Sequence, residues 1–399
     1  MHPIGLYLHL PFCSRICHYC DFVKSALYTE EQKTFYLLSL ESLLDDYLNV
    51  WKEIPGTGNE SKPAFYSVFW GGGTPSLVTH ELRPIMQKIL AVTSPTAEIT
   101  LEANPEHITR ESVAIWADAG INRISLGVQS FHTAGLKALT REHTTEQALK
   151  AIDVVRERIP NCNVDLIYGW PGQTDADWIE DLKTLVKSGA THASLYNLTF
   201  EGSTPFARRL ARGKMTAIDD DRLYGFYETA CKILEKSGYI HEEVSNWALP
   251  DREARHNGLY WYGGSYLALG AGAHSYLEEL GPYGLRWQQN GNWRTFVPES
   301  SSTLQGIITR KYNEIDADRD GEAWIMETVS SGLRTWKGIS LPEIEAKSGY
   351  RFEPRPLIKE ALERGLMRLD AERRLFLSEL EWFRETRWSL EAALSFALS

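Results

Sequence analysis

Three of the chain's five cysteines, Cys13, Cys17 and Cys20, stand close together in the spacing C-x3-C-x2-C. Thiolates are soft ligands, and in a reducing compartment their usual partners are zinc or iron–sulfur clusters. Structural zinc normally has four ligands, and His18, between two of the cysteines, would have to fold back to supply the fourth. Three cysteines fit a cubane cluster that leaves one iron open to a small molecule. The spacing therefore predicts an iron–sulfur cluster, with a structural zinc site as the alternative.

The composition of the whole chain argues against several other classes of protein. The 399 residues carry a net charge of −11 and no cluster of Lys and Arg, which argues against nucleic-acid binding. No run of about 18 apolar residues occurs, so we expect no membrane span. The N-terminal residues lack the features of a secretory signal, and an odd number of cysteines argues against a secreted disulfide framework. We expect a cytoplasmic protein in which the isolated Cys162 and Cys231 pack in the core.

Short β-rich runs alternate with segments that have the apolar spacing of helices. The β-rich runs are 5–10, 64–70, 97–103, 123–130, 163–169 and 192–199. The helical segments between them include 32–48, 81–92, 146–159 and 178–189. This alternation predicts parallel βα units in an α/β fold. Six β-rich runs favour a partial (β/α)6 TIM-like barrel over a closed eightfold barrel.

Polar and glycine-rich residues follow these runs, at the positions where α/β folds place their sites. The cysteines follow the first run, Gly71–Thr74 the second and Glu102 the third. Gln129 ends the fourth run. Because the C-terminal ends of parallel strands meet at one edge of a sheet, we expect these residues to share one site.

The pattern changes after residue 200, and we divide the chain into three parts. Residues 1–210 form the barrel core, residues 211–300 an extension that completes the catalytic domain, and residues 301–399 a mostly helical, winged-helix-like domain. Residues 296–318 are polar and irregular and predict a linker. Winged helices often bind DNA, but acidic side chains slightly outnumber basic ones from residue 311 onward, so we interpret the C-terminal domain as a lid or docking element.

The cysteine spacing after a first strand, with Gly71–Pro75 after the second, resembles the radical S-adenosylmethionine (radical SAM) superfamily. In that superfamily the amino and carboxylate groups of SAM chelate the open iron. One electron from the cluster then cleaves a C–S bond and leaves a 5′-deoxyadenosyl radical. The resemblance implies a [4Fe–4S] cluster and bound SAM, with a protein that orients them and excludes water.

Further motifs resemble the oxygen-independent coproporphyrinogen oxidase group of that superfamily. They lie at 7–13, 70–76, 102–105, 123–131, 139–143 and 165–173, within a resemblance that covers most of residues 5–340. The oxidases carry a further cysteine at the position of Phe22, whereas the haem-chaperone branch, HemW, has Asp-Phe there. That branch also carries an H-N-x-x-Y-W motif, present here at residues 256–261, and Gly270–His274 resembles it as well. The resemblance therefore favours the haem-chaperone branch.

The resemblance implies a set of SAM-binding residues at the strand ends. They are Tyr7, Tyr19, Phe22, Gly72, Gly73, Thr74, Glu102, Gln129, Arg141 and Asp165. Gly72 and Gly73 let the backbone approach the SAM amino group, and an ordinary tight turn is the alternative. Glu102 can accept two hydroxyls of the ribose or bind the methionine end, and Arg141 can form a fork with the SAM carboxylate.

Other members of this set are placed by resemblance alone. Gln129 and Asp165 face the adenosine side of SAM, and Tyr7 lies beside the cluster. Tyr19 and Thr74 match positions that contact a second SAM in the oxidases, so one or two SAM molecules are expected. Exposed or capping roles are the alternatives for these side chains.

His256 is the candidate axial haem ligand, because imidazole is the commonest such ligand. Tyr260 and Trp261 of the same motif complete the candidate haem site. The alternative is a histidine that is hydrogen-bonded near a domain junction, with both aromatic residues in the core. The rival haem ligands are His9, His143, His241 and His274. No catalytic residue is assigned.

The residues and the resemblance together predict a haem chaperone that binds the cluster, SAM and haem. It would deliver haem to a haemoprotein, expected to be respiratory, and would receive electrons from a donor such as flavodoxin or ferredoxin. Peripheral contact with a membrane and a monomer or dimer are expected; a nucleic-acid partner is not. The alternative is a radical SAM enzyme that acts on a porphyrin, as a coproporphyrinogen III dehydrogenase or oxidase, a methyltransferase or a haem-degrading relative.

Overall fold

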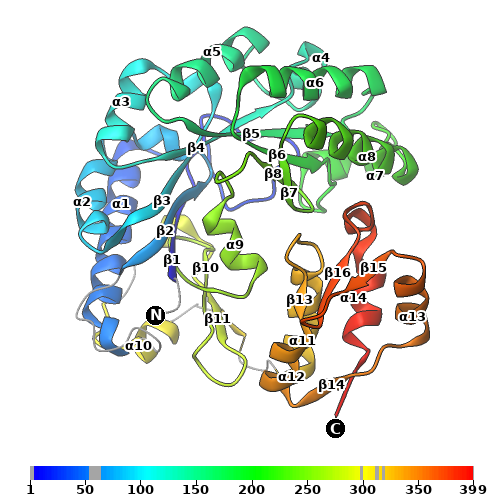
Figure 1. Ribbon diagram of the computed structural model, residues 1–399. Helices are drawn as coiled ribbons and strands as arrows, with labels where there is room; N and C mark the ends of the chain where they lie inside the picture. The colour runs from blue at the N-terminus through cyan, green and yellow to red at the C-terminus, as the bar shows by residue number, and fades with distance from the viewer. Residues whose placement is uncertain (1–3, 54–63, 297–299, 311–313, 317–319, 399) are drawn as a thin grey trace.

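The N-terminal half of the chain alternates strands with helices, as the sequence predicts (Figure 1). The computed structural model describes residues 4–53, 64–296, 300–310, 314–316 and 320–398. The strands are β1 (Ile4–Leu10), β2 (Phe65–Gly72), β3 (Thr93–Ala103), β4 (Arg123–Gln129), β5 (Asn161–Tyr168) and β6 (His192–Asn197). The helices are α1 (Glu30–Asn49), α2 (Leu82–Leu90), α3 (Arg110–Asp118), α4 (Thr133–Ala138), α5 (Thr145–Arg156), α6 (Asp175–Ser188), α7 (Pro205–Ala211) and α8 (Asp220–Lys236).

These strands belong to one twelve-stranded sheet in the order β12-β11-β10-β9-β1-β2-β3-β4-β5-β6-β8-β7. The added strands are β7 (Ile240–Glu243), β8 (Asn246–Ala248), β9 (Ser265–Leu269), β10 (His274–Leu277), β11 (Leu285–Gln288) and β12 (Glu314–Asp316). β9 pairs in parallel with β1, and antiparallel strands flank the parallel run on both sides. Because β12 and β7 end the sheet among the described residues, the barrel is open, which confirms the predicted partial barrel.

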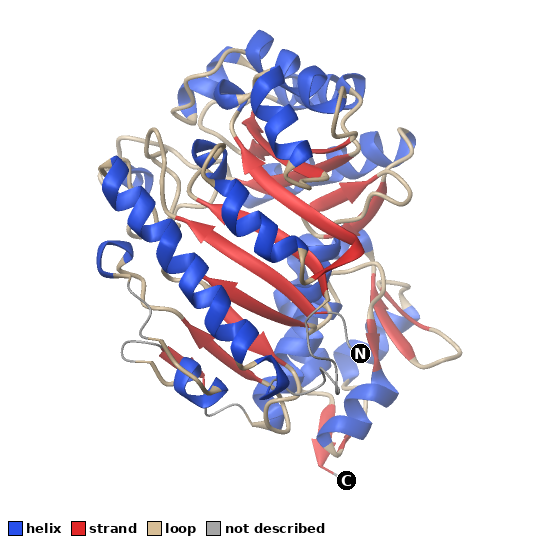
Figure 2. Ribbon diagram, turned by 90° about the vertical axis from the view of Figure 1, so that its left-hand side faces the viewer, coloured by secondary structure: helices blue, strands red, loops and turns tan. Residues whose placement is uncertain are grey.

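Alternate residues of β1 face opposite sides of the sheet. Leu6, Leu8 and Leu10 are fully buried in the main core, which also contains apolar residues of α1. Figure 2 shows α1 and its neighbours as a layer over the strands. Burying one such leucine contributes about 1.5–3 kcal/mol. Tyr7, on the other side of β1, faces the hollow of the barrel. The apolar face thus fixes the sheet against the helices and leaves the inner face for polar groups.

Four of the helices begin with the same local signal. Each has a threonine whose hydroxyl accepts a hydrogen bond from the third helical N–H, in a capping box. The four are Thr29, Thr109, Thr144 and Thr174. Such caps are worth about 1 kcal/mol each and set where each loop after a strand ends.

Across the described ranges, none of the helices combines the length and apolar character that a membrane span requires.

Part of the segment predicted as a linker belongs to the barrel instead. α10 (Leu304–Ile308) buries Ile307 and Ile308 in the main core, and β12 pairs with β11. The linker prediction is wrong for these residues, because elements this short carry too few apolar positions to show a period. The residues 297–299, 311–313 and 317–319 lie outside the described residues.

The C-terminal part has an apolar core of its own. Its helices are α11 (Gly321–Gly332), α12 (Leu341–Ser348), α13 (Pro356–Glu363) and α14 (Glu385–Ala393). Its strands are β13 (Ile339–Ser340), β15 (Met367–Leu369) and β16 (Arg374–Leu377) in one sheet, and β14 (Tyr350–Phe352) with β17 (Phe396–Leu398) in another. This arrangement confirms a mostly helical, winged-helix-like C-terminal region. The boundaries at 210 and 300 stay predictions.

Backbone contacts join the C-terminal part to the barrel beside β7 (Figure 1). The N–H of Val244 donates to the carbonyl of Arg334 at 3.1 Å, and the N–H of Trp336 donates to the carbonyl of Glu242 at 3.1 Å. These bonds hold the loop after α11 against the end of the large sheet.

Candidate functional site

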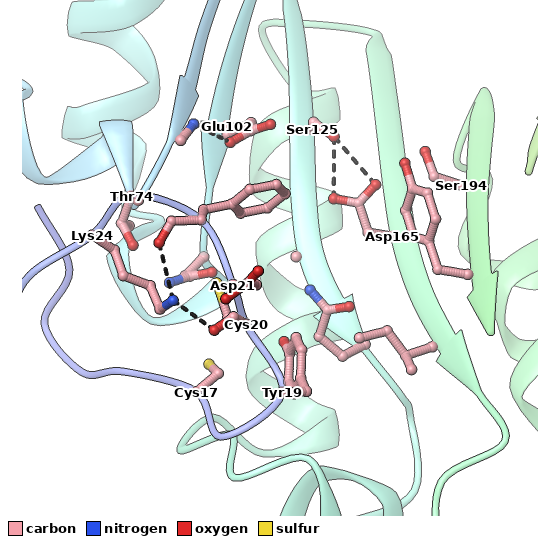
Figure 3. Close-up of a pocket in the computed structure, with 18 of the residues that line it drawn as sticks. Cys17, Tyr19, Cys20, Asp21, Lys24, Thr74, Glu102, Ser125, Asp165 and Ser194 are labelled. Atoms are coloured by element: carbon pink, nitrogen blue, oxygen red, sulfur yellow. Dashed lines mark hydrogen bonds between the residues drawn. The ribbon is translucent and has the colours of Figure 1, made fainter. Parts of the chain in front are cut away.

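A cavity of about 860 Å³, called the cysteine cavity here, opens at the C-terminal ends of β1–β6. It gathers every residue predicted for the cluster and SAM and two of the three predicted for haem. These are Cys13, Cys17, Cys20, Tyr7, Tyr19, Phe22, Gly72, Gly73, Thr74, Glu102, Gln129, Arg141, Asp165, His256 and Tyr260. Figure 3 shows the cysteine loop on one side of this space and Glu102 and Asp165 on the strands across from it. Trp261, at the end of α9 (Arg255–Trp261), lines other cavities instead.

The cysteine loop between β1 and α1 is closed at its base by backbone hydrogen bonds. The N–H of Cys13 donates to the carbonyl of Ser25 at 3.0 Å, and the N–H of Ser25 donates to the carbonyl of Pro11 at 2.6 Å. A turn further along brings the N–H of Cys20 to 3.3 Å from the carbonyl of Cys17. The loop therefore leaves the sheet and returns to it, so that all three thiols stay beside the cavity.

Burial disfavours the thiolate form of two of the three cysteines. Burial raises the pKa of Cys13 to about 11, although a hydrogen bond with Thr74 opposes the shift, and burial also raises the pKa of Cys20. In the described part of the chain no three His, Cys, Asp or Glu side chains converge as they would on a single metal ion. A cubane differs, because its thiolates bind separate irons, and three soft donors on one loop fit such a cluster. Cys162 and Cys231 are buried in the core, as predicted.

Arg141 connects the cysteine loop with β4. Its Nη2 donates to Asn104 Oδ1 at 2.6 Å and to the carbonyl of Gly127 at 2.8 Å. Its Nη1 lies 3.5 Å from Cys17 Sγ, and its Nε is buried without a hydrogen-bond partner among the described residues. The protein thus fixes one side of the guanidinium and leaves a donor for an anionic ligand.

Glu102 is the last residue but one of β3 and lines the cavity. Its Oε2 accepts a hydrogen bond from the N–H of Gly72 at 3.1 Å (Figure 3). Burial, and then the charge of Asp165, raise the pKa of Glu102 to about 8. Its carboxyl therefore carries a proton for most of the time at neutral pH, and can both donate and accept a hydrogen bond.

Gly72 and Gly73 are required by packing within the protein. A Cβ on Gly72 would lie 2.6 Å from the His9 ring, and one on Gly73 would lie 2.7 Å from the carbonyl oxygen of Phe12. Gly72 also has a φ of +109°, which favours glycine. The sequence predicts a close approach to SAM here, and the structure provides another reason: the loop after β2 lies directly against β1 and the cysteine loop.

Polar side chains of β4 and β5 meet at Asp165. Its carboxylate accepts hydrogen bonds from Asn163 Nδ2 at 2.7 Å and from Ser125 Oγ at 3.2 Å, and burial raises its pKa. Gln129 stands where β4 bulges, with a φ of +72° and a register shift after Gly127. A bulge changes the direction in which side chains leave a strand. Gln129, the last residue of β4, lines the cavity.

The three aromatic residues predicted for SAM lie at different depths. Tyr7 Oη is hydrogen-bonded to His9 Nδ1 at 3.1 Å, inside the barrel. Tyr19 packs beside Phe206, with ring centroids 6.4 Å apart. Phe22 is 69% exposed at the edge of the cavity. A ligand can therefore meet Phe22 without any rearrangement of the core.

His256 is buried, and both of its ring nitrogens are hydrogen-bonded. Nδ1 is 2.8 Å from Ser67 Oγ, and Nε2 is 2.8 Å from Tyr260 Oη. Burial lowers the pKa of His256 to about 3, so the ring is neutral at physiological pH. The predicted role as a haem ligand requires one of these hydrogen bonds to break. Trp261 lies beneath the guanidinium of Arg334, 5.0 Å from its ring centroid, outside the cysteine cavity.

The four rival histidines do not line the cysteine cavity among its described residues. His9 is bonded to a backbone carbonyl at 2.7 Å and His143 to another at 3.0 Å. His241 stacks on a tryptophan with ring centroids 4.1 Å apart, and His274 is exposed on β10. The structure therefore brings only His256 of the five to the predicted site.

Several residues of the cysteine cavity are not singled out by the sequence. They are chiefly Arg15 and Lys24 on the cysteine loop, and Arg123, Ser125, Asn163, Ser194 and Tyr196 on β4–β6. The strand residues stand two positions apart on the face that carries Asp165, so alternation along each strand is the signal that could reveal them. Lys24 carries no such signal. Its Nζ donates to the carbonyl of Cys20 at 2.5 Å and to that of Phe22 at 3.0 Å (Figure 3).

Comparison with known proteins defines the class to which this fold and cavity belong. Residues 7–185 match the Radical SAM superfamily. The coproporphyrinogen III oxidase HemN from Escherichia coli, a radical SAM enzyme, has a similar fold. The TM-score is 0.76 at 21% identity, over 98% of this chain and 90% of that chain. The fold is that of a radical SAM protein.

Relatives in sequence identify the family within that class. The haem chaperone HemW of Mycobacterium tuberculosis is 38% identical over 363 residues, which cover 88% of this chain and 86% of that protein. The HemW of Lactococcus lactis is 32% identical over 358 residues, with the same coverage of 88% and 86%. The chain belongs to the HemW family of the radical SAM superfamily. Superfamily membership implies a [4Fe–4S] cluster and SAM, and the family's name indicates haem.

Proposed function

We propose that this protein is a haem chaperone that binds a [4Fe–4S] cluster, SAM and haem and delivers haem to a haemoprotein. The observation that best supports it is the cysteine cavity, which holds three thiols, two buried carboxyls and a fixed guanidinium in one space. The likeness to HemW proteins over most of the chain supports the haem part of the proposal.

Cys13, Cys17 and Cys20 would hold the cluster. When bound, the cluster supplies an electron to SAM. The protein's part is to keep the three thiols on one side of the cavity, and the hydrogen bonds of Lys24 to the loop carbonyls support that geometry. Phe22 stands where the oxidases carry a further cysteine on this loop.

The walls across from the loop would bind SAM. Arg141 Nε, which has no hydrogen-bond partner among the described residues, would donate to the SAM carboxylate. Glu102, protonated at neutral pH, can donate to one ribose hydroxyl and accept from the other. Asp165 would bind the adenosine side, and the remaining contacts would come from Tyr7, Tyr19, Phe22, Gly72, Gly73, Thr74 and Gln129.

The cluster also implies the conditions in which the protein works. Reduced thiols and a reducible cluster require a reducing compartment, so we place the protein in the cytoplasm. A donor such as flavodoxin or ferredoxin would reduce the cluster. The recipient would be a respiratory haemoprotein, reached through peripheral contact with the membrane by a monomer or a dimer.

Haem transfer tests this proposal. The anaerobically reconstituted protein should bind haem saturably, with a Soret band, and pass it to a respiratory apohaemoprotein. Apomyoglobin, which captures freely dissociating haem, is the control acceptor. We expect faster transfer to the respiratory acceptor; equal rates, set by dissociation alone, would contradict delivery.

The fold likeness to HemN favours a second candidate, a radical SAM enzyme that acts on a porphyrin. The position of Phe22 argues against the oxidase, because the oxidases carry a further cysteine there. Anaerobic incubation with coproporphyrinogen III, SAM and dithionite separates the two candidates. Formation of a decarboxylated porphyrinogen would show that the protein is the enzyme and would contradict the chaperone proposal.

A further inference from the structure

A second cavity, of about 570 Å³, lies between α9 and β9–β11 on one side and α11 and α12 on the other. Its volume is within the range of about 300–1,000 Å³ that is typical of small-molecule sites. Tyr260 lines both this cavity and the cysteine cavity, whereas Trp261 lines only the second of the two. The predicted haem residues are therefore divided, with His256 on the cysteine cavity and Trp261 on the second cavity.

Aromatic rings make up much of the wall of the second cavity. Besides Tyr260 and Trp261, they are Tyr262, Tyr266, Tyr276 and Trp324. The ring of Tyr260 meets that of Tyr266 edge-on, with centroids 4.7 Å apart. Tyr260 is 41% exposed and lines both cavities. Several rings around one space favour a flat aromatic ligand, which gains contact area and ring–ring interactions there.

Two lysines stand over these rings. Lys337 Nζ lies 4.4 Å from the ring centroid of Tyr262, and Lys347 Nζ lies 5.0 Å from that of Trp324. Arg374 Nε donates to the carbonyl of Lys337 at 3.1 Å and so supports the loop that carries this lysine. Neither lysine forms an ion pair with a carboxylate of the described residues, so both ammonium groups can receive an anionic group of a ligand.

The acidic residues of the second cavity do not cancel the positive charge of the two lysines. Glu327 is engaged by Arg286 in an ion pair. Glu278 and Glu343 line the same cavity as three further cations, the two lysines and the supporting arginine. In the cysteine cavity, four cationic and four carboxyl side chains line the space, and the proposed function assigns that space to the cluster and SAM. In the second cavity, four cationic side chains stand against three carboxylates, so a further ligand that carries carboxylates is better matched there.

We propose that haem binds in the second cavity and not in the cysteine cavity. This assignment rests on the proposed function as a haem chaperone. The haem macrocycle lies against the aromatic wall that includes Tyr260 and Trp324. Its propionates pair with Lys337 and Lys347. Haem then contacts Tyr260, which also lines the cysteine cavity and whose hydroxyl is hydrogen-bonded to His256.

Removal of the two ammonium groups tests this assignment. In the reconstituted full-length protein, the double variant Lys337→Ala/Lys347→Ala should bind haem at least about tenfold more weakly in a Soret titration. Its cluster signal and its affinity for SAM should stay at the wild-type level. The matched control is Lys183→Ala/Lys187→Ala, which removes two exposed charges from α6, away from both cavities. Equal haem affinity in the double variant and this control would overturn the assignment.

The dimethyl ester of haem tests the same contacts from the ligand's side. The ester should bind the wild-type protein more weakly than haem does, because its propionates are no longer charged. It should bind the lysine variant about as well as haem does, because the partners of those charges are gone. An equal loss on esterification in both proteins would overturn the assignment. A wild-type protein that binds no haem at all would instead overturn the proposed function, and the assignment with it.

Discussion

Arg141 has one geometry because its guanidinium is held by an amide oxygen and a backbone carbonyl at once. Arg141→Lys keeps the charge but cannot keep this fork. A hydrogen bond to a charged group is worth about 1.5–3 kcal/mol, so we expect the Kd for SAM to rise about 10- to 100-fold while the cluster is retained. Isothermal titration calorimetry measures this Kd. Arg110→Lys, in an exposed pair with Glu157, is the control, and an unchanged Kd in Arg141→Lys would contradict the role.

Glu102 makes the stability of the metal-free protein depend on pH. Its ordinary pKa of 4.5 is raised to about 8 in the fold. Between these values the unfolded chain is ionised at Glu102 and the folded chain is not, so the free energy of unfolding falls as pH rises through this window. The fall is at most about 1.4 kcal/mol per pH unit.

Glu102→Gln cannot ionise and should lose this component. Its stability relative to wild type should therefore increase from pH 6 to pH 8, by up to about 1.4 kcal/mol per unit. Urea denaturation at pH 6, 7 and 8 measures the difference. The control is Glu201→Gln, at an exposed position on the same cavity. A difference that does not change with pH would show that Glu102 is ionised in the folded protein.

At the scale of elements, the loop after β2 and the cysteine loop form one packed unit. Gly73→Ala would place a Cβ 2.7 Å from the Phe12 carbonyl oxygen and 2.8 Å from that of Leu10, both on the backbone. We expect a loss of about 1–3 kcal/mol in stability and poor retention of iron after reconstitution. Thermal unfolding and iron analysis check these outcomes.

Gly225→Ala is the matched control for that substitution. Gly225 lies within α8, and a Cβ there would meet no atom within 4 Å. Alanine favours a helix by up to about 1 kcal/mol over glycine, so this variant should be as stable as wild type or more stable. Iron retention by Gly73→Ala at the level of Gly225→Ala would show that the contact between the loops is dispensable.

The sequence predicts the parallel strands well because each is a run of apolar, β-favouring residues long enough to be distinct. β9, with five residues, and β12, with three, fall below that length and were missed. α3 was also missed, although Thr109 begins it with a capping box. Of the polar residues of β4–β6 that line the cysteine cavity, only Gln129 and Asp165 were predicted, because single polar residues within apolar strands form no pattern until the strands are aligned.

The sequence predicts correctly that the site lies at the C-terminal ends of the strands, but it does not predict the individual side-chain contacts there. The cysteines, Glu102 and Arg141 could be predicted because they stand at strand ends or in motifs. His256 and Tyr260 stand four positions apart in α9, so helical spacing could have predicted their hydrogen bond. That Trp261 lines another cavity depends on how α9 packs against β2 and α11. No local pattern contains that packing, because its partners are far apart along the chain.

On the scale of the whole molecule, Trp382 fastens the C-terminal part to the barrel. Its ring is 1% exposed and lies 4.5 Å from the His241 ring of β7. Trp382→Ala should cost about 3–5 kcal/mol and, because the C-terminal core is separate, raise hydrogen exchange chiefly in residues 320–396. Trp336→Ala, at a ring that is 46% exposed, is the control. Equal exchange throughout the chain in Trp382→Ala and wild type would contradict this role.

The proposed function requires three thiols that hold a cubane and leave one iron to SAM in the cysteine cavity. Electron paramagnetic resonance of the reconstituted, dithionite-reduced protein tests this most directly, before and after addition of SAM. We predict a signal of a reduced [4Fe–4S] cluster whose g values shift when SAM is added, and no such signal in Cys17→Ser. A cluster signal that SAM leaves unchanged would show that SAM does not bind the open iron.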